Sequence, residues 1–499
     1  MKRIYITTAI PYVNAAPHIG FALELVQTDC VARFYRMLGW DVYFATGSDE
    51  NSLKNVQAAE DANVDVRKFV DRNAQEFAKL KEALNLSWDV FNKTSLGHHF
   101  AGAQKFWKLC KSEDIYKKNY RGLYCIGCET FYAKEEIVDG KCPDGHMNIE
   151  EVEEENYFFK LSSYQGYLEK LISTDKLRIV PNTRKHEVLS FIRQGLEDFS
   201  ISRSVERSHG WGVPVPSSAT HYAPHSGASR VEKASEGKPD DQVMYVWFDA
   251  LTTYLTALGF GKNEELYKKW WVDPSTSSGS SIIHVIGKGI IRFHAVYWPV
   301  MLASAGLPLP NVEFVHGYIT VDGQKISKSL GNTIDPFELV DKYGVEAVRY
   351  YLLREIPAWG DGDFSLRRFG ELYNGELANG LGNLVARVAR LASDTNLSLP
   401  PKKNFTFKKV VSDNLKNFRF DHALLGLWDE ISVLDKKINE EKPWELEGQA
   451  LKKTISPIAQ EIREIAFNLA PFLPETSEKI LDQFTGKISA EKPLFPRLH

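Results

Sequence analysis

Cysteine is scarce in this sequence, and long apolar runs and an excess of charge of one sign are absent. The chain holds 5 cysteines among 499 residues, an odd number that cannot be fully paired. Three of them fall between Cys125 and Cys142, a clustering that does not suit an extracellular disulfide framework. The count therefore favours a protein of the reducing cytoplasm.

No apolar stretch is long enough to cross a membrane. A spanning helix needs about 18 predominantly apolar residues, and Thr, Pro, Gly or a charged residue interrupts every candidate here. The N-terminal segment Ile4–Val13 contains threonines and a proline, which do not suit the apolar core of a signal peptide. We therefore expect no membrane partner and interpret this segment as a first buried strand.

The charge balance is nearly even, with 61 basic and 65 acidic side chains and a formal net charge of −4. We expect no DNA partner, because general DNA binders carry a basic surface, although a local basic face can still bind a specific RNA. Hydrophobic residues at 43% and charged residues at 25% exclude a disordered or fibrous chain. The length predicts a protein of several domains.

The sequence predicts a strand, a helix and a strand twice, near the N-terminus and again far downstream. Such units build parallel, nucleotide-binding sheets, so we predict an α/β fold whose Rossmann-type parallel sheet is split by a long insertion. The predicted elements are a strand at Arg3–Thr8, a helix from Ile19 to Met37, a strand at Asp41–Thr46, a strand at Ser281–Ile286, a helix at about 290–305 and a strand at Val312–His316.

We predict four parts along the chain: the first half of the sheet domain at 1–115, the insertion at 116–240, the second half of the sheet domain at 241–365 and an α-helical domain at 366–499. Within the insertion, the acidic run Glu150–Glu155 precedes mixed helical sequence that extends to about Arg207. The segment from Ser217 to Asp241 has no periodicity and is interpreted as a polar surface loop without an assigned function.

The segment from Pro17 to Phe21 lies between the first strand and its helix. Backbone N–H groups at a helix N-terminus favour a phosphate, Gly20 permits close approach, and His18 can donate to a phosphate oxygen. Taken alone the segment is a weak signal, because a histidine at a helix start is commonly a cap or a packed polar residue.

A second phosphate-binding candidate is the loop from Asp322 to Asn332, in which Lys325 and Lys328 flank Ser327. Two lysines on a glycine-bounded loop can close over a polyphosphate and stabilise the charge of departing pyrophosphate. The alternative is a solvated lysine loop. Because this loop follows a strand of the sheet whose first crossover carries His18, the two motifs together indicate a bipartite ATP site.

A metal site is predicted by Cys125-x-x-Cys128, followed after thirteen residues by Cys142 and then His146. Three thiolates and an imidazole at this spacing can form a tetrahedral structural zinc site. A redox-active Cys-x-x-Cys pair is the alternative, but it leaves Cys142 and His146 unexplained. We therefore predict one structural Zn²⁺ per chain.

These motifs, in this order, resemble those of class I aminoacyl-tRNA synthetases, and the resemblance narrows to methionyl-tRNA synthetases over essentially the whole chain. His18–Phe21 is similar to the HIGH motif and Lys325–Ser329 to the KMSKS motif. The resemblance implies a methionine–tRNA ligase that uses ATP with Mg²⁺ to form methionyl-adenylate and then transfers methionine to the 3′-terminal adenosine of tRNA(Met). His18, Lys325 and Lys328 are the implied catalytic residues, and Gly20 and Ser327 complete the implied ATP site.

The resemblance also implies a pocket for L-methionine. Asp49, in the segment GSDEN, is expected to hold the ammonium group, and a charge-assisted hydrogen bond there selects an α-amino acid. Aromatic and aliphatic walls suit a flexible thioether. Core packing is the better explanation of Trp247 or Tyr254 taken alone, but the joint order of these residues favours the pocket. The implied pocket residues are Ala9, Ile10, Tyr12, Asp49, Trp247, Ala250, Leu251, Tyr254, Ile290 and His294.

The remaining implied roles concern the insertion and the helical domain. The zinc knuckle is expected to be structural, and the helical domain is expected to read the CAU anticodon through Asn383, Arg387 and Trp444. Asn383 and Arg387 are four residues apart and so share one helix face. Stacking and edge hydrogen bonding commonly recognise single-stranded bases. Without the resemblance, Arg387 is a surface cation and Trp444 a hydrophobic anchor.

The sequence departs from the family pattern at three positions. Phe21 replaces the second histidine of HIGH and cannot donate to a phosphate, so either His18, the two lysines and backbone amides suffice or nucleotide binding is altered. Gly289 stands where aspartate is common and Leu251 where proline is common. The chain ends without the appended tRNA-binding module that drives dimerisation in some members, so we expect a monomer.

Two alternatives stay open at this point. The first is a class I synthetase for another apolar amino acid or cysteine, which Tyr12, Trp247 and His294 together disfavour. The second is a non-catalytic, zinc-containing RNA-binding protein with a decayed synthetase fold. Phe21 keeps this second alternative open, whereas the intact lysines and Asp49 argue against it.

Overall fold

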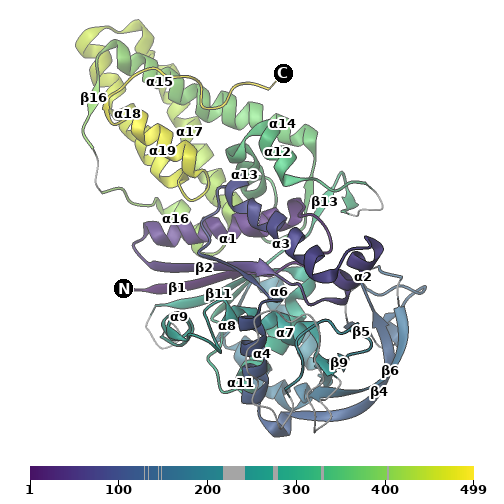
Figure 1. The fold of residues 1–499 in the computed structure, drawn as a ribbon. Helices are drawn as coiled ribbons and strands as arrows, with labels where there is room; N and C mark the ends of the chain where they lie inside the picture. Colours follow the sequence, from purple (N-terminus) through teal and green to yellow (C-terminus); the bar gives the residue numbers. More distant parts are fainter. Residues whose placement is uncertain are drawn as a thin grey trace. The chain divides into compact units, whose positions relative to one another are not determined.

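The computed structural model describes residues 1–127, 130–132, 134–143, 145–147, 149–216, 242–273, 279–326, 331–401 and 404–498 (Figure 1). The predicted surface loop at 217–241 lies outside the described residues. The chain divides into two compact units, which are described separately. Unit 1 comprises Met1–Ala16, Trp40–Lys79 and Trp88–Val315, and unit 2 comprises Pro17–Gly39, Leu80–Ser87 and His316–His499. The four domain ranges expected from the sequence stay predictions.

Unit 1 is built on a six-stranded sheet with the order β3-β2-β1-β11-β12-β7. β1 pairs in parallel with both β2 and β11, which confirms that the early and late halves form one sheet. Neither β3 nor β7 was predicted, because runs of 4 and 3 residues are too short to show a period. The strands are β1 Arg3–Thr8, β2 Asp41–Ser48, β3 Val90–Lys93, β7 Arg178–Val180, β11 Ser281–Gly287 and β12 Val312–His316.

Short helices follow several of these strands. The predicted helix at about 290–305 is present but changes its geometry along its length. A 3₁₀ turn at Lys288–Ile290 and a π turn at Phe293–Tyr297 precede α11 at Trp298–Ser304, and Pro299, which has no N–H to donate, lies in the first turn of α11. The other helices near the site are α2 Leu53–Asp61, α3 Val66–Ala83, α4 Gly97–Leu109, α7 Val246–Leu251 and α8 Thr253–Thr256.

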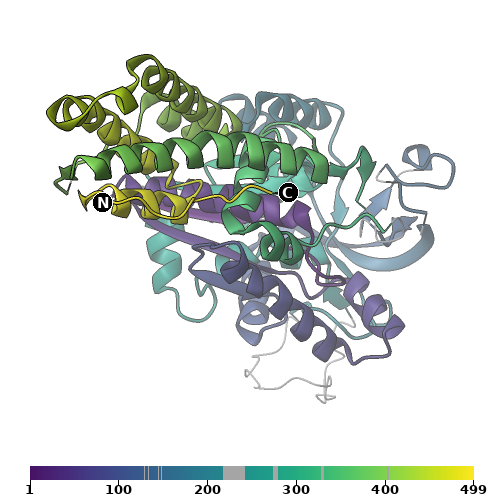
Figure 2. The same ribbon diagram turned by 90° about the horizontal axis from the view of Figure 1, so that it is seen from above.

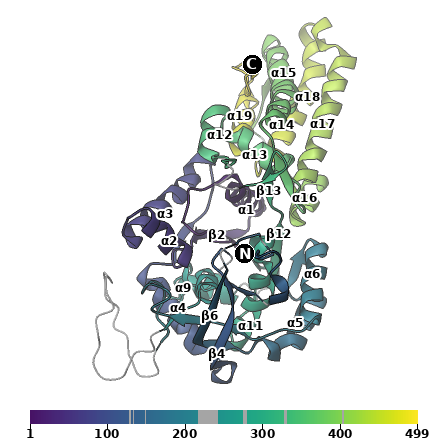
Figure 3. The ribbon, with the colours of Figure 1, turned by 90° about the vertical axis from the view of Figure 1, so that its right-hand side faces the viewer.

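The insertion holds a four-stranded antiparallel sheet with the order β5-β4-β6-β8, and its long β4–β6 ribbon is labelled in Figure 3. The acidic run Glu150–Glu155 lies inside β6 and faces the more basic β4, where Arg121 and Glu151 form an ion pair at 2.8 Å. Because charged residues occupy both faces of this exposed ribbon, the sequence does not show the alternation of apolar and polar residues that predicts a strand. The strands are β4 Ile115–Cys125, β5 Thr130–Tyr132, β6 Ile149–Phe159 and β8 Phe199–Ser200, and the helices are α5 Gln165–Ser173 and α6 Asn182–Arg193.

Unit 2 is mostly helical, which confirms the helical pattern predicted from Leu366 onward. Its long helices α15, α17 and α18 lie side by side in Figures 1 and 3. The C-terminal segment runs beside the helical region that precedes α15 (Figure 2), where Asn374 and Leu498 exchange two hydrogen bonds. The helices are α1 Ile19–Met37, α12 Pro336–Tyr343, α13 Val345–Arg354, α14 Leu366–Leu372, a π helix at Tyr373–Gly382, α15 Asn383–Asp394, α16 Lys409–Lys416, α17 Phe420–Glu441, α18 Gly448–Leu469 and α19 Pro474–Gln483.

A buried ion pair fastens α1 inside unit 2. Arg349 of α13 is fully buried and binds the Asp29 carboxylate of α1 at 2.8 Å, and its other N–H groups donate to backbone carbonyls, including that of Phe472 at 2.9 Å. Burial by itself raises the pKa of Asp29, but Arg349 and Arg33 outweigh burial and hold that pKa below its usual value. This ion pair and its backbone hydrogen bonds therefore connect α1 with α13 and with the turn after α18. We refer to the pair as the Asp29–Arg349 hub.

Within the part of the chain that the structure describes, no helix combines the length and apolar character needed to cross a membrane.

Candidate functional site

The predicted pocket segments lie at the carboxyl ends of neighbouring strands. Ala9–Tyr12 follows β1, Asp49 follows β2, and the turn at Lys288–Ile290 follows β11. Backbone hydrogen bonds join these segments, from Asp49 N–H to the Pro11 carbonyl at 2.8 Å and from Ala9 N–H to the Val285 carbonyl at 3.1 Å. In open α/β sheets this edge is where ligands bind.

Asp49 is held firmly within this edge. The residue is only 2% exposed, and its Oδ1 accepts the Asn51 N–H at 3.1 Å. Its carbonyl accepts the Asn55 side-chain amide at 2.9 Å, and its backbone forms a parallel bridge with Tyr12. A carboxylate fixed in this way can accept hydrogen bonds from an ammonium group with little reorganisation.

Aromatic side chains cluster around Tyr12, whose backbone pairs with that of Asp49. Trp247 stacks on Phe293 with ring centroids 3.8 Å apart and an interplanar angle of 4°, and Tyr12 meets Trp247 edge-on at 6.4 Å. The buried Nε1–H of Trp247 has no acceptor among the described residues. Phe293 was not predicted as a site residue, although it directly precedes His294 in the same segment. Such ring faces and edges suit a thioether.

His294 and Tyr254 form a buried pair in the same unit. The Tyr254 hydroxyl lies 2.6 Å from His294 Nε2, and His294 Nδ1 lies 2.9 Å from the Ile290 carbonyl. The carbonyl can only accept, so Nδ1 carries the proton and Nε2 accepts from Tyr254. Burial lowers the pKa of His294 from 6.5 to about 4, although the bond to Ile290 opposes the shift. The imidazole is therefore neutral at physiological pH.

The other predicted pocket residues lie in the same segments. Ala250 and Leu251 are buried in α7, three and four residues after Trp247, and Ile10 and Ile290 are half-buried. The structure thus places all ten predicted pocket residues within unit 1, in the segments that follow β1, β2, β10 (Gln242–Met244) and β11.

His18 caps α1 in unit 2. Its Nδ1 accepts the Gly20 N–H at 3.0 Å, so Nε2 of the neutral ring carries the proton and can donate to an oxygen. The surrounding protein lowers the pKa of His18 by desolvation, although the side chain keeps an exposed edge. A Cβ on Gly20 would lie 2.8 Å from His18 Cε1, so any side chain here would displace the capping imidazole. The cap and the phosphate-donor interpretations are therefore compatible.

The lysine loop is described only in part. The Lys325 backbone lies in β14 (Gln324–Lys325), but its side chain and the residues Ser327 and Lys328 lie outside the described residues. Their roles stay predictions. Just beyond the loop, the Ile334 carbonyl accepts the N–H of Ile19, the first residue of α1, at 3.0 Å. This bond brings the end of the loop segment to the helix start that His18 caps.

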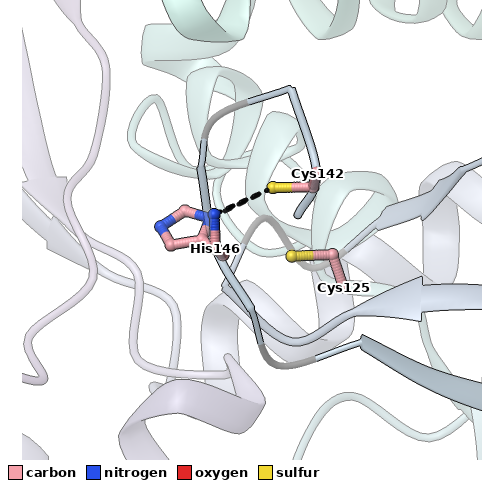
Figure 4. A group of neighbouring side chains, drawn as sticks. All are labelled: Cys125, Cys142 and His146. Carbon is pink, nitrogen blue, oxygen red and sulfur yellow. Dashed lines mark hydrogen bonds between the residues drawn. The ribbon is translucent and has the colours of Figure 1, made fainter. Parts of the chain in front are cut away.

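Cys125, Cys142 and His146 converge on one point in the insertion (Figure 4), with ligand atoms all within 4.8 Å of one another. The Cys142 Sγ and His146 Nδ1 atoms are 3.6 Å apart, and a Cβ on Gly127 would lie 2.4 Å from the His146 ring. Two sulfurs and an imidazole nitrogen at these separations fit three corners of a tetrahedral metal site. The predicted fourth ligand, Cys128, lies outside the described residues.

The predicted anticodon residues lie in the helical part of unit 2. Asn383 begins α15, and Arg387 of the same helix bonds Asn439 at 3.0 Å and Asp435 at 2.5 Å, both on α17. Trp444 is 50% exposed in the 3₁₀ turn that follows α17. Arg387 of α15 thus contacts the carboxyl-terminal part of α17, and Trp444 follows the end of that helix. Contact of these residues with a base stays a prediction.

Comparison with known proteins agrees with this architecture. A family model described as tRNA synthetases class I (M) matches residues 4–151 and 147–389. Methionine–tRNA ligases of Thermotoga maritima and Brucella suis are 38% and 37% identical to the chain, cover 98% and 99% of it, and are themselves covered over 76% and 98% of their length. A solved Mycobacterium tuberculosis methionyl-tRNA synthetase in complex with methionyl-adenylate is 35% identical, with a TM-score of 0.86 and full coverage of both chains.

The parallel sheet, the segments gathered at its carboxyl edge and the family match define a class I aminoacyl-tRNA synthetase, and the chain belongs to that class. Its relatives at 37–38% identity over nearly the whole chain are methionine–tRNA ligases. Within the class, the chain is a member of the methionine–tRNA ligases.

Proposed function

We propose that this chain activates L-methionine with ATP, giving methionyl-adenylate and pyrophosphate, and then transfers methionine to the 3′-terminal adenosine of tRNA(Met). The observation that carries the proposal is the set of ten pocket residues in the segments around the sheet edge, in a chain whose relatives are methionine–tRNA ligases. The methionyl-adenylate bound by the Mycobacterium tuberculosis relative supports the intermediate.

In the first step, a methionine carboxylate oxygen attacks the α-phosphorus of ATP, and the bond to the departing pyrophosphate breaks. The proposed role of Asp49 is to bind the ammonium group and so fix the carboxylate for attack. The stacked Trp247 and Phe293, with the edge of Tyr12, pack against the thioether, and neutral His294 with Tyr254 closes the polar side of the pocket. No side chain acts as a nucleophile.

Charge on the phosphates is stabilised by a separate set of groups. His18 Nε2–H and the backbone N–H groups at the start of α1 donate to phosphate oxygens, with Gly20 allowing close approach. Lys325, Ser327 and Lys328 complete the proposed ATP site by the family resemblance. Mg²⁺ bound with ATP supplies further positive charge. Phe21 offers no donor, so this chain relies on the remaining groups.

We propose that Cys125, Cys128, Cys142 and His146 hold one structural Zn²⁺. The described sulfurs and imidazole supply the donor types that zinc prefers, and a fourth thiolate closes the site to chemistry. Elemental analysis of the purified chain should find about one zinc per chain, and Cys142→Ser should lose it. A metal-free wild-type chain that keeps its thermal midpoint would contradict the proposal.

The proposed tRNA contacts are Asn383, Arg387 and Trp444. Asp435 and Asn439 hold the Arg387 guanidinium in place before a base arrives, and the exposed Trp444 ring is available for stacking. The cytoplasmic location and the monomeric state expected from the sequence stay predictions.

The decisive test is amino-acid-dependent exchange of pyrophosphate into ATP by the purified chain. Methionine, leucine, isoleucine, valine and cysteine are each supplied at equal concentration. We expect strong exchange with methionine and at most weak exchange with the others. Exchange that is strongest with another amino acid would overturn the substrate assignment. No exchange at all, with tRNA binding retained, would favour the non-catalytic RNA-binding alternative.

A further inference from the structure

A buried polar network lies behind Asp49, and none of its members belongs to the proposed pocket. Its central members are Asn51, directly downstream of β2, His99 of α4 and Asp249 of α7, which are 3%, 0% and 1% exposed. All three belong to unit 1. Their sequence separations of 150 and 198 residues explain why no sequence pattern connects them.

Asp249 accepts hydrogen bonds at both carboxylate oxygens. His99 Nε2 lies 2.5 Å from Oδ1, and the Asn51 side-chain amide donates to Oδ2 at 2.8 Å. A carboxylate can only accept, so His99 Nε2 carries a proton. On the other side of the ring, His99 Nδ1 lies 2.8 Å from the hydroxyl of Thr256, which also receives the Asn92 amide at 3.1 Å. The imidazole is therefore fixed at both nitrogens.

Asn51 connects this network to the pocket. Its side-chain amide is held at two points, by Asp249 and by the Thr94 carbonyl at 3.0 Å. Its backbone N–H donates to Asp49 Oδ1 at 3.1 Å. A chain of three hydrogen bonds thus runs from His99 through Asp249 and Asn51 to the carboxylate that faces the substrate in the proposed function. Asp249 also lies two residues after Trp247 in α7.

We propose that His99 and Asp249 are positioning residues for methionine: they hold Asn51 so that its N–H fixes the rotamer of the Asp49 carboxylate toward the ammonium group. The proposal rests on the assigned role of Asp49. Removing a carboxylate and an imidazole from water is costly, and a well-packed apolar pair is commonly as stable, so packing alone does not explain the pair. A hydrogen-bonded pair also fixes the orientation of both side chains, which apolar packing does not do.

The first test separates the hydrogen bond from the packing. His99→Leu removes both ring nitrogens at similar volume, whereas the terminal amide of His99→Gln can place a donor where Nε2 stood. In pyrophosphate exchange we expect His99→Leu to raise the KM for methionine about tenfold or more while the KM for ATP changes less than twofold. His99→Gln is expected to restore most of the loss. Equal changes in both KM values, or no rescue by Gln, would overturn the proposal.

Asp249→Asn is a second, isosteric variant in case His99→Leu fails to fold. The oxygen of the new amide can still accept the hydrogen bond from His99 Nε2. Its N–H₂ group faces the Asn51 amide, which is also a donor, so the substitution breaks only the hydrogen bond to Asn51. We expect the same selective rise in the methionine KM. A variant with the wild-type KM for methionine would show that the hydrogen bond to Asn51 does not help to position the Asp49 carboxylate.

A double-mutant cycle tests whether the effect passes through Asp49. Methionine affinity is measured by equilibrium dialysis for the wild type, Asp49→Asn, Asp249→Asn and the double variant. If Asp249 acts through Asp49, its substitution weakens binding in the wild type but changes it less than twofold in the Asp49→Asn background. Equal losses in both backgrounds would overturn the proposal. Wild-type exchange with methionine is measured first, so that failure of the proposed function is recognised separately.

Discussion

His294 shows at the scale of one residue how burial sets a protonation state. Its pKa of about 4 lies below the ordinary value of 6.5, so the unfolded chain binds a proton at mildly acidic pH that the folded chain does not bind. The stability from this group is fully present above pH 6.5 and is lost as the pH falls from 6.5 toward 4. The neutral ring is also the form that accepts the Tyr254 hydroxyl.

We therefore predict that His294 contributes to acid sensitivity. Between pH 7 and pH 5 the wild type should lose about 2 kcal/mol more stability than His294→Gln, because glutamine does not titrate. Urea unfolding at the two pH values measures the difference. Equal losses in the two proteins would show that His294 titrates normally in the folded state.

At the scale of the element, the start of α1 depends on Gly20. A methyl group at this position would lie 2.8 Å from His18 Cε1 and so displaces the capping imidazole. We predict that Gly20→Ala lowers kcat/KM for ATP about tenfold or more in pyrophosphate exchange and leaves the KM for methionine nearly unchanged. Loss of the cap costs about 1 kcal/mol of stability in addition.

Gly97→Ala is the matched control, because Gly97 also begins a helix, α4, and a Cβ there meets no atom within 4 Å. This variant should keep wild-type kinetics for both substrates. If Gly20→Ala behaves like Gly97→Ala, the His18 imidazole has no part in ATP binding.

Elements differ in how readily the sequence reveals them. The segment Arg3–Thr8 and the helix from Ile19 were predicted with their observed starts, because a turn with two prolines and a glycine stop bound them. The β4–β6 ribbon was missed, since charged residues on exposed strands conceal their alternation. The network of Asn51, His99 and Asp249 was also missed, because hydrogen bonds between distant segments leave no local pattern.

At the scale of the whole molecule, the Asp29–Arg349 hub has the largest expected effect on stability. We predict that Arg349→Met destabilises unit 2 by about 3 kcal/mol, because the buried Asp29 carboxylate loses one of its two guanidinium partners and keeps only Arg33. The double variant Asp29→Asn with Arg349→Met removes both charges and should recover part of this loss. Calorimetric unfolding midpoints compare the three proteins, and a double variant less stable than Arg349→Met would contradict the charge argument.

The comparisons with known proteins address one of the two alternatives that the sequence left open about the molecule as a whole. The match to methionine–tRNA ligases over nearly the full chain disfavours a synthetase for another amino acid. Physical argument from the sequence alone could not identify the amino-acid substrate, because Trp247 or Tyr254 in isolation is better explained as a core residue. The proposed pocket depends instead on their assembly with Phe293 and His294 in the segments around one sheet edge.

The pairing of β1 with β11 has a consequence for synthesis on the ribosome. Thr7 and His284 face each other on these strands although 277 residues separate them. At about 5–20 residues per second, the nascent β1 waits roughly 15–55 s before its second neighbour is made. During that interval β1, a middle strand of the finished sheet, has one unpaired edge. We therefore expect chaperones that shield unpaired strands to bind the nascent chain.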